Sequence, residues 1–214
     1  TSNGGKASSS YYPCQDGAYI QEITPPKGYL KDSTKYTLKA GSANFTIEKN
    51  TISQTVADDV ITGRIAVAKK KEIPDPESGT DVDLSSEENA EFQIYLKSAG
   101  SYDKAKETER DILKTDSAGY DQSKELPYGT YVLHQTKGDE TTKFVDREIT
   151  ISENGKIYFY DLLNELKKAR IKIIKIDSST GNAIPMSGIK VKIKNLTTGK
   201  WVIDHGKEIF ESTE

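Results

Sequence analysis

The chain has 214 residues, of which 29% are charged and 34% hydrophobic, and its formal net charge is −3. This length suits one large domain, two small ones, or one whole domain flanked by partial ones. Acids and bases are mixed along the chain, so the basic surface of a nucleic-acid-binding protein is not predicted. No apolar run is long enough to span a membrane. Residues 1–10 are too polar for a signal peptide, so a secretion signal would lie upstream.

Alternating apolar and polar residues predict short strands along the chain. In chain order, the clearest strands are expected at 64–69, 130–134, 148–151 and 170–173. Turns are expected at 26–28, 117–119, 127–129 and 153–155. Residues 103–113 have a helical composition and predict a short helix or an ordered loop. Short strands separated by Gly and Pro predict an all-β sandwich.

Few residues indicate site chemistry. The single cysteine, Cys14, excludes an intrachain disulfide and is interpreted as a partly buried thiol. His134 is expected on a strand surface and His205 in a turn, and the two are far apart in sequence. The acidic stretch 72–88 is expected to be an exposed loop without the ligand spacing of a calcium site. We therefore predict no metal, no cofactor and no enzyme active site.

The chain contains an internal repeat of roughly one hundred residues, the usual size of a sandwich domain. Residues 63–69 (GRIAVAK) align with residues 169–175 (ARIKIIK), and at the same offset Asp58 aligns with Asn164. We therefore predict the C-terminal half of one module at 1–61, a complete module at 62–167 and the N-terminal half of a third at 168–214. Such a division would be expected of a piece cut from a longer tandem array.

Four segments resemble motifs of the Cna-B/SpaA-type repeat domains of Gram-positive adhesins and pilins. Residues 19–29 (YIQEITPPKGY) resemble the E-box of that family, and residues 126–131 (LPYGTY) resemble its LPxGTY strand opening. Residues 171–185 (IKIIKIDSSTGNAIP) resemble its first strand and following turn, and residues 90–95 (AEFQIY) its second strand. Together they cover most of the chain in the family's order. The resemblance implies a prealbumin-like, reverse-Ig β-sandwich.

The resemblance also implies an intramolecular isopeptide bond between a first-strand lysine and a last-strand Asn or Asp, assisted by the E-box glutamate. In the middle module these positions fall on Lys69 and Asn164, with Gln135 where the family has glutamate. The remaining candidates are Glu22 and Asp58 in the first module and Lys175 in the third.

Strand parity gives a separate expectation for the middle module. Lys69 shares parity with Ile65 and Val67 and should point inward, whereas Lys70 should point outward and Lys71 should lie beyond the packed region. Burial would lower the pKa of the Lys69 ammonium and favour the nucleophilic neutral amine.

The glutamine at the E-box position requires another proton relay. Gln135 can donate a hydrogen bond to a carbonyl, but it cannot pass a proton on as a carboxyl group does. Glu148 or Asp161 could take that role only if the fold turned one of them inward.

These observations predict a structural stalk or spacer of a bacterial surface adhesin or pilus-type protein. It would be extracellular, attached to a Gram-positive cell wall, and rigidified by Lys–Asn isopeptide crosslinks. Neighbouring modules of the chain are the expected partners, with host extracellular protein or glycan as further candidates. Two alternatives remain open: a ligand-binding sandwich, and an ancillary sandwich of a secreted carbohydrate enzyme. Trp201, the single tryptophan, gives little support for a sugar-stacking face.

Overall fold

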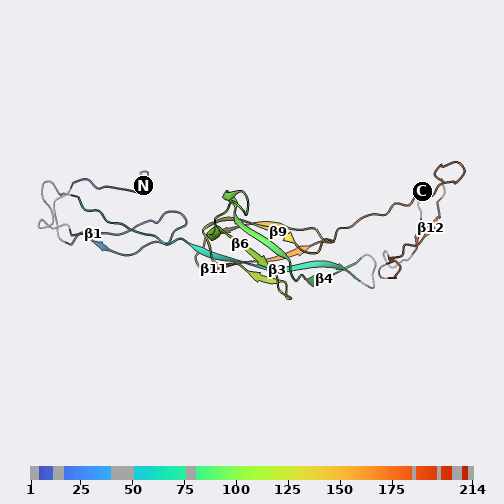
Figure 1. The fold of residues 1–214 in the computed structure, drawn as a ribbon, viewed down its shortest axis with the longest axis horizontal. Helices are drawn as coiled ribbons and strands as arrows, with labels where there is room; N and C mark the ends of the chain where they lie inside the picture. Colours follow the sequence, from blue (N-terminus) through green and yellow to red (C-terminus); the bar gives the residue numbers. More distant parts are fainter. Residues whose placement is uncertain are drawn as a thin grey trace. The chain divides into compact units, whose positions relative to one another are not determined.

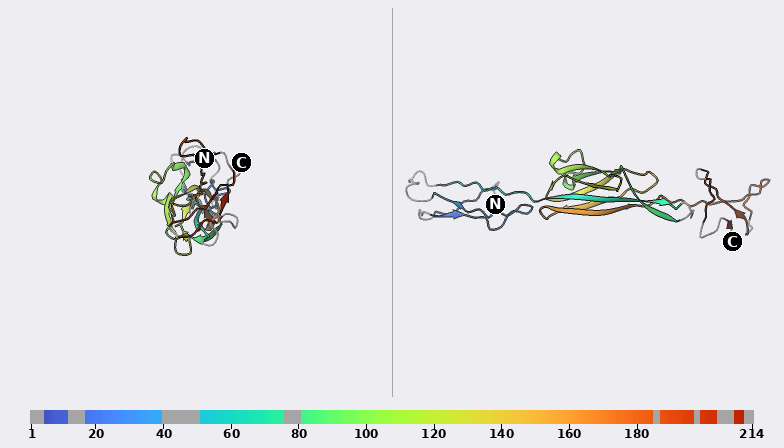
Figure 2. Two further views of the ribbon diagram at one scale, coloured as in Figure 1. Left: turned by 90° about the vertical axis from the view of Figure 1, so that its right-hand side faces the viewer. Right: turned by 90° about the horizontal axis from the view of Figure 1, so that it is seen from below.

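A computed structural model describes residues 5–11, 17–39, 51–75, 81–184, 187–196, 199–203 and 209–211. The chain divides into two compact units, Thr1–Ile61 and Thr62–Glu214 (Figures 1 and 2). Nearly all regular structure in the described residues is β-strand, so the predicted all-β class is confirmed. Among those residues, no helix has the length and apolarity needed to cross a membrane. Cys14 and His205 lie outside the described residues.

Two sheets form a β-sandwich in the second unit. The first sheet is antiparallel, in the order β10 (Asp146–Ile151), β9 (Gly129–Lys137), β5 (Glu91–Leu96) and β6 (Arg110–Lys114). In the second sheet, β11 (Lys156–Asn164) runs parallel to β3 (Thr62–Pro74). Three further strands pair antiparallel with β3: β4 (Val82–Ser86), β7 (Tyr120–Gln122) and β8 (Leu126–Pro127). The long strand β3 therefore lies at the centre of its sheet.

The hydrophobic core lies between these two sheets, because alternate residues of each strand face inward. From β3 it receives Ile65 and Val67, which are both fully buried. The other sheet and β11 supply most of the rest of the core: Phe92, Ile94, Leu113, Tyr131, Leu133, Ile149, Ile151 and Leu162. This packing confirms the inward parity predicted for the strand at 64–69.

Three of the four clearest predicted strands are confirmed, at 64–69, 130–134 and 148–151. The prediction for 103–113 is half right. A 3₁₀ turn, η3 (Glu107–Glu109), follows an irregular loop, but Arg110–Lys114 is strand β6 paired with β5. A second 3₁₀ turn, η2 (Lys97–Ala99), follows β5. The strand forms because it completes an antiparallel sheet, which outweighs the weak helical propensity of this segment.

The expectation of a continuous exposed loop at 72–88 is wrong. Strand β3 continues to Pro74 and β4 returns alongside it, so the acidic stretch includes part of a hairpin. At its end, Glu87 is buried, with only 2% of its surface exposed.

The first unit contains a small two-stranded sheet, β1 (Tyr19–Ile20) and β2 (Tyr36–Thr37). The predicted turn at 26–28 is present: Tyr29 N donates to Pro26 O at 3.2 Å, and Gly28 has a φ of +91°. The left-handed conformation at position 28 explains why glycine stands there, two residues after Pro26.

The predicted strand at 170–173 is wrong. Described residues 168–175 contain no strand, and Ile171 and Ile173 are more than half exposed. Farther along, β12 (Lys190–Val191) pairs with β13 (Phe210–Glu211). Without a paired strand among the described residues, the alternation of this segment has no sheet to pack into.

Candidate functional site

Strand β3 places Lys69 inside the sandwich, as its parity predicted. Its side chain is fully buried, whereas Lys70 is exposed. The backbone is fixed on both sides, because Lys69 N donates to Gly119 O at 2.7 Å and Glu87 N donates to Lys69 O at 3.0 Å. Lysine is almost never fully buried unless its charge is paired. The groups around this ammonium must therefore compensate for its charge.

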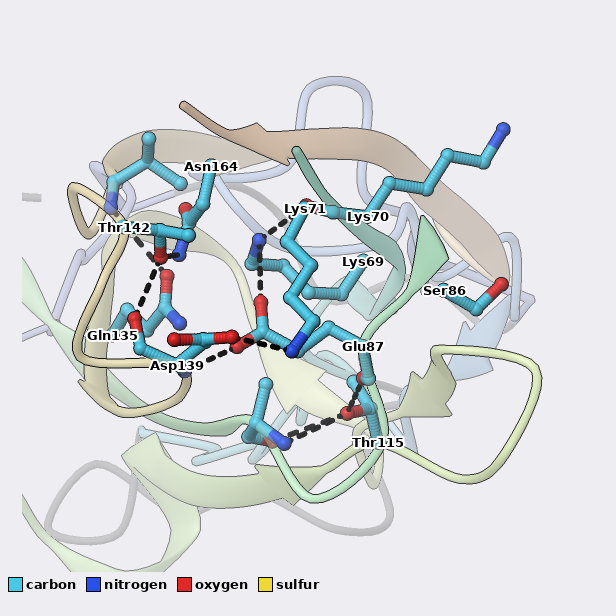
Figure 3. Close-up of polar contacts among 12 residues, drawn as sticks. Lys69, Lys70, Lys71, Ser86, Glu87, Thr115, Gln135, Asp139, Thr142 and Asn164 are labelled. Carbon is cyan, nitrogen blue, oxygen red and sulfur yellow. Dashed lines mark hydrogen bonds and ion pairs between the residues drawn. The ribbon is translucent and has the colours of Figure 1, made fainter. Parts of the chain in front are cut away.

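Asn164 ends β11 and lies beside Lys69 on the same face of the sheet. The β3–β11 register places Leu162 opposite Lys69, so Asn164 is two residues farther along with the same parity. Such diagonal neighbours on adjacent strands are within reach of a long side chain. Asn164 is fully buried. Figure 3 shows the lysine and the asparagine entering one interior site from adjacent strands.

The amide of Asn164 is oriented by a chain of hydrogen bonds. Its Nδ2 donates to Thr142 Oγ1 at 3.2 Å, and this hydroxyl donates to Asp139 O at 2.8 Å. Because the hydroxyl proton is used on Asp139, the Thr142 oxygen must accept from the asparagine NH₂ group. The carbonyl oxygen Oδ1 of Asn164 is buried and has no hydrogen-bond partner among the described residues.

Glu87 supplies the carboxylate of the site, and the sequence analysis missed it. Its Oε2 lies 3.0 Å from Lys69 Nζ in an ion pair between two buried side chains. Its Oε1 accepts a hydrogen bond from Asp139 N at 2.5 Å. Its carbonyl oxygen accepts from Thr115 Oγ1 at 2.6 Å. Contacts to both the backbone and the carboxylate of Glu87 therefore fix the position of its side chain.

The electrostatics of the site favour a reactive amine. Burial lowers the pKa of the Lys69 ammonium, and the neighbouring Lys71 charge lowers it further, while Glu87 opposes both effects. The ammonium also donates to Lys70 O at 2.6 Å. In a buried pair of this kind, transfer of the proton from lysine to glutamate removes two charges from a poorly solvated site. The neutral amine that results is the nucleophilic form.

Gln135, at the E-box position, is buried beside Glu87 but is engaged with the backbone. Its Nε2 donates to Lys137 O at 3.1 Å, and its Oε1 accepts from Val145 N at 3.5 Å. A Cβ on Gly138 would stand 2.5 Å from Gln135 Nε2 and 2.7 Å from Glu87 Oε1, so these two polar groups are neighbours. Gly138 leaves the space in which both side chains fit.

A second ion pair closes the rim of the site. Lys71 Nζ lies 2.6 Å from Asp139 Oδ2, so the expectation that Lys71 lies beyond the packed region is wrong. The hydrogen bond from Lys71 is the main cause that lowers the pKa of the Asp139 carboxyl to about 2, and hydrogen bonds from Thr141 contribute next. Asp139 therefore remains ionised near neutral pH. The backbone N–H of Asp139 donates to Glu87, and its backbone C=O accepts from Thr142.

The structure brings Lys69, Gln135 and Asn164 together and leaves both alternative acids outside. Glu148 is exposed and pairs with Lys97, and Asp161 is exposed on β11. The sequence did not identify Glu87 because it follows a run of polar residues with no apolar alternation. No local signal marks its burial, which arises from contacts with residues far from it in sequence.

The candidates predicted for the first and third modules stay predictions. Glu22 Oε2 accepts from Asp32 N at 2.8 Å, and Asp32 Oδ2 accepts from Tyr36 Oη at 2.6 Å. Asp58 Oδ1 is buried without a hydrogen-bond partner among the described residues. Lys175 is exposed in the segment without strands. An isopeptide role for Glu22, Asp58 or Lys175 has no completed site around it within the described residues.

Other residues give no competing site in the described part of the chain. No cluster of three or more potential metal ligands is found there. His134 is exposed on β9, with Nδ1 2.9 Å from Asp146 Oδ1, as expected of a strand-surface residue. Two lysine ammonium groups lie over the Trp201 ring, those of Lys192 at 5.2 Å and Lys194 at 5.5 Å. Trp201 thus makes cation–π contacts with lysines near it in sequence.

Comparisons with known proteins give structural similarity without a sequence family. No family model matches the chain, and no curated protein matches it. The TIE protein of Bacillus anthracis is 23% identical over 91% of this chain and 33% of its own, with a TM-score of 0.49. GBS52, the minor pilin of Streptococcus agalactiae, is 18% identical over 55% of this chain and 51% of its own, with a TM-score of 0.41.

The shaft pilin SpaA of Lactobacillus rhamnosus GG is 15% identical over 71% of this chain and 78% of its own, with a TM-score of 0.37. Gram-positive pilins are thus among the structures that the chain resembles, as its motifs predicted. The chain spans only a third of the TIE protein and half of GBS52. Its function therefore has to be argued from its own residues.

Proposed function

We propose that residues 62–167 are a structural module of a Gram-positive pilus or surface protein, locked by an isopeptide bond between Lys69 and Asn164. The observation that supports this most strongly is the burial of a lysine and an asparagine side by side on β3 and β11, with a carboxylate 3.0 Å from the amine. At a buried position of this kind, an apolar residue would stabilise the sandwich as well as a lysine or better. A covalent reaction of the lysine side chain would explain why lysine is buried there.

The bond would link the first and last strands of the sandwich. Its closed loop of roughly one hundred residues would stabilise the module by about 4–5 kcal/mol, by analogy with disulfide loop closure. Because β3 and β11 are already adjacent and parallel, the crosslink requires no rearrangement of the sheet. A pulling force would then pass from strand to strand through covalent bonds, and the sandwich would resist extension. This is the property that a stalk requires.

The location and partners follow from this role. An extracellular position on the cell surface, with neighbouring modules or other subunits as partners, fits a load-bearing module. Formation of the isopeptide bond would be a single-turnover maturation step within the chain, so the proposed protein is structural and not an enzyme. A host protein or glycan as ligand remains the second candidate function.

The mass of the intact protein tests the bond. We expect the wild-type chain to be lighter than its sequence mass by one ammonia, about 17 Da. Lys69→Arg should have its full sequence mass, because a guanidinium cannot form this amide. Lys70→Arg, at the exposed neighbouring lysine, is the matched control and should keep the deficit. A wild-type chain at full mass, folded by circular dichroism, would overturn the proposal.

A further inference from the structure

The Lys69–Asn164 pair needs a proton-transfer group, and the expected position for it holds glutamine. An amide side chain such as that of Gln135 can donate and accept hydrogen bonds, but it has no titratable proton near neutral pH. Both ends of the Gln135 amide are also engaged with the backbone of residues 137 and 145. If the bond forms, another group in this module must move the proton.

Resting on the proposed function, we infer that Glu87 is the catalytic acid–base group of isopeptide formation in this module, relocated from the E-box strand to the segment after β4. Its carboxylate contacts the reacting amine directly, with Oε2 3.0 Å from Lys69 Nζ. It is the only acid among the described residues that makes an ion pair with Lys69.

The geometry also couples Glu87 to the acceptor. The backbone of Asp139 lies between them: its N–H donates to Glu87 Oε1, and its C=O accepts from Thr142, which holds the Asn164 amide. One residue therefore contacts both the carboxylate and the group that holds the amide, through its two flanking peptide groups (Figure 3). The Lys71–Asp139 ion pair links this residue to β3. Such preorganisation places the reactants together and supplies effective molarity.

The remaining acids do not compete with Glu87. Asp139 is held ionised by Lys71, which keeps the pKa of its carboxyl at about 2, so it is a poor proton donor. Glu148 and Asp161 are exposed. Gln135 is a neighbour of Glu87 through the space at Gly138, so a carboxyl group at either position would lie in the same site.

With Glu87 as the proton relay, every proton of the reaction is accounted for. The Lys69 ammonium gives one proton to the Glu87 carboxylate, and the neutral Nζ attacks Asn164 Cγ. The Nζ–Cγ bond forms, and the developing oxyanion is Asn164 Oδ1, which has no other partner among the described residues. Glu87 then protonates Nδ2, the Cγ–Nδ2 bond breaks and ammonia leaves. The second proton of the attacking nitrogen returns to Glu87 or leaves with ammonia as ammonium.

The decisive variant is Glu87→Gln, which keeps the size of the side chain and an acceptor for Asp139 N. We expect the wild type to lack about 17 Da and Glu87→Gln to have its full sequence mass, with a cooperative melt that shows the fold intact. Loss of a general acid–base group should slow formation roughly 100- to 10,000-fold. Glu88→Gln, at the exposed neighbouring acid, is the matched control and should retain the deficit.

A double variant keeps the proposal falsifiable if Glu87→Gln does not fold. In Glu87→Gln/Gln135→Glu the carboxyl group moves to the adjacent position, so we expect the deficit to return. Glu87→Gln with an undiminished deficit would overturn the role of Glu87, as would a folded double variant at full mass. A wild-type chain at full mass would instead overturn the isopeptide function itself, so the two failures are distinguishable.

Discussion

The same short pattern occurs twice in this chain and ends in two different environments. In residues 63–69 the apolar positions Ile65 and Val67 are fully buried and the terminal Lys69 is buried with them. In residues 169–175 the corresponding isoleucines are more than half exposed, and Lys175 is exposed as well. The amino-acid pattern is shared, so the difference arises from what surrounds each segment.

The difference is the number of paired strands. Strand β3 pairs with β4, β7, β8 and β11, and the opposite sheet covers its inner face. The segment at 170–175 contains no strand, and after it an isolated bridge joins Ile176 to Ala183. An alternating sequence does not form a stable strand by itself, because the stability of a strand depends on cross-strand neighbours and on a covered face. The burial of Lys69 is therefore a property of the assembled sandwich.

The largest expected effect comes from the same substitution at both lysines. Lys69→Met removes the crosslink and leaves the Glu87 carboxylate buried without its partner. We expect a loss of about 4–5 kcal/mol, the contribution of closing a loop of this length, since in the crosslinked protein the amide has replaced the ion pair. The melting temperature should fall by on the order of 20 °C. Differential scanning calorimetry measures both quantities.

Lys175→Met is the matched control for this comparison. Because Lys175 is exposed, its replacement should change the stability of the sandwich by less than about 0.5 kcal/mol. Equal effects of the two substitutions would show that the buried site makes no special contribution.

The sequence could predict the parts of the site that strand periodicity controls. Parity alone places Lys69 inside, and the repeat aligns Asn164 with Asp58. Glu87 could not be found this way, because a residue outside a strand has no periodicity. Its burial depends on hydrogen bonds to Lys69, Thr115 and Asp139, which lie far from it in sequence. Local pattern does not encode such contacts.

The same limit explains the fold errors. Residues 110–114 were expected to be helical or looped, yet β5 supplies an edge on which they form β6. The segment at 170–173 alternates well but has no paired strand among the described residues. In both places the pairing with other strands determined whether a strand formed. The propensity of a single segment carries no information about such pairing.

A second prediction compares two glycines with positive φ. A Cβ on Gly119 (φ +78°) would stand 2.2 Å from Lys69 O, whereas Gly181 (φ +71°) has nothing within 4 Å. Gly119→Ala should therefore cost at least about 2 kcal/mol, through backbone strain and a clash with a carbonyl that holds Glu87 N. Gly181→Ala has only its local strain and should leave the melting of the sandwich unchanged. Chemical denaturation of both variants measures the difference, and equal midpoints would contradict the close approach at Gly119.

The smallest expected effect concerns the rim ion pair and depends on pH. The pKa of Asp139 falls from 3.8 to about 2 in the folded protein, mainly through its hydrogen bond from Lys71. A depressed folded-state pKa stabilises the protein above the unfolded value, and this stabilisation is lost as pH falls from about 4 to 2. Wild type should therefore lose about 2 kcal/mol more than Asp139→Asn over this range. Urea denaturation at pH 5 and pH 2 measures the difference, with the exposed Asp161→Asn as control. An Asp139→Asn variant with the wild-type acid dependence would show that Lys71 does not hold this carboxylate, and would remove the anchor proposed for the Asp139 backbone beside Glu87 and Thr142.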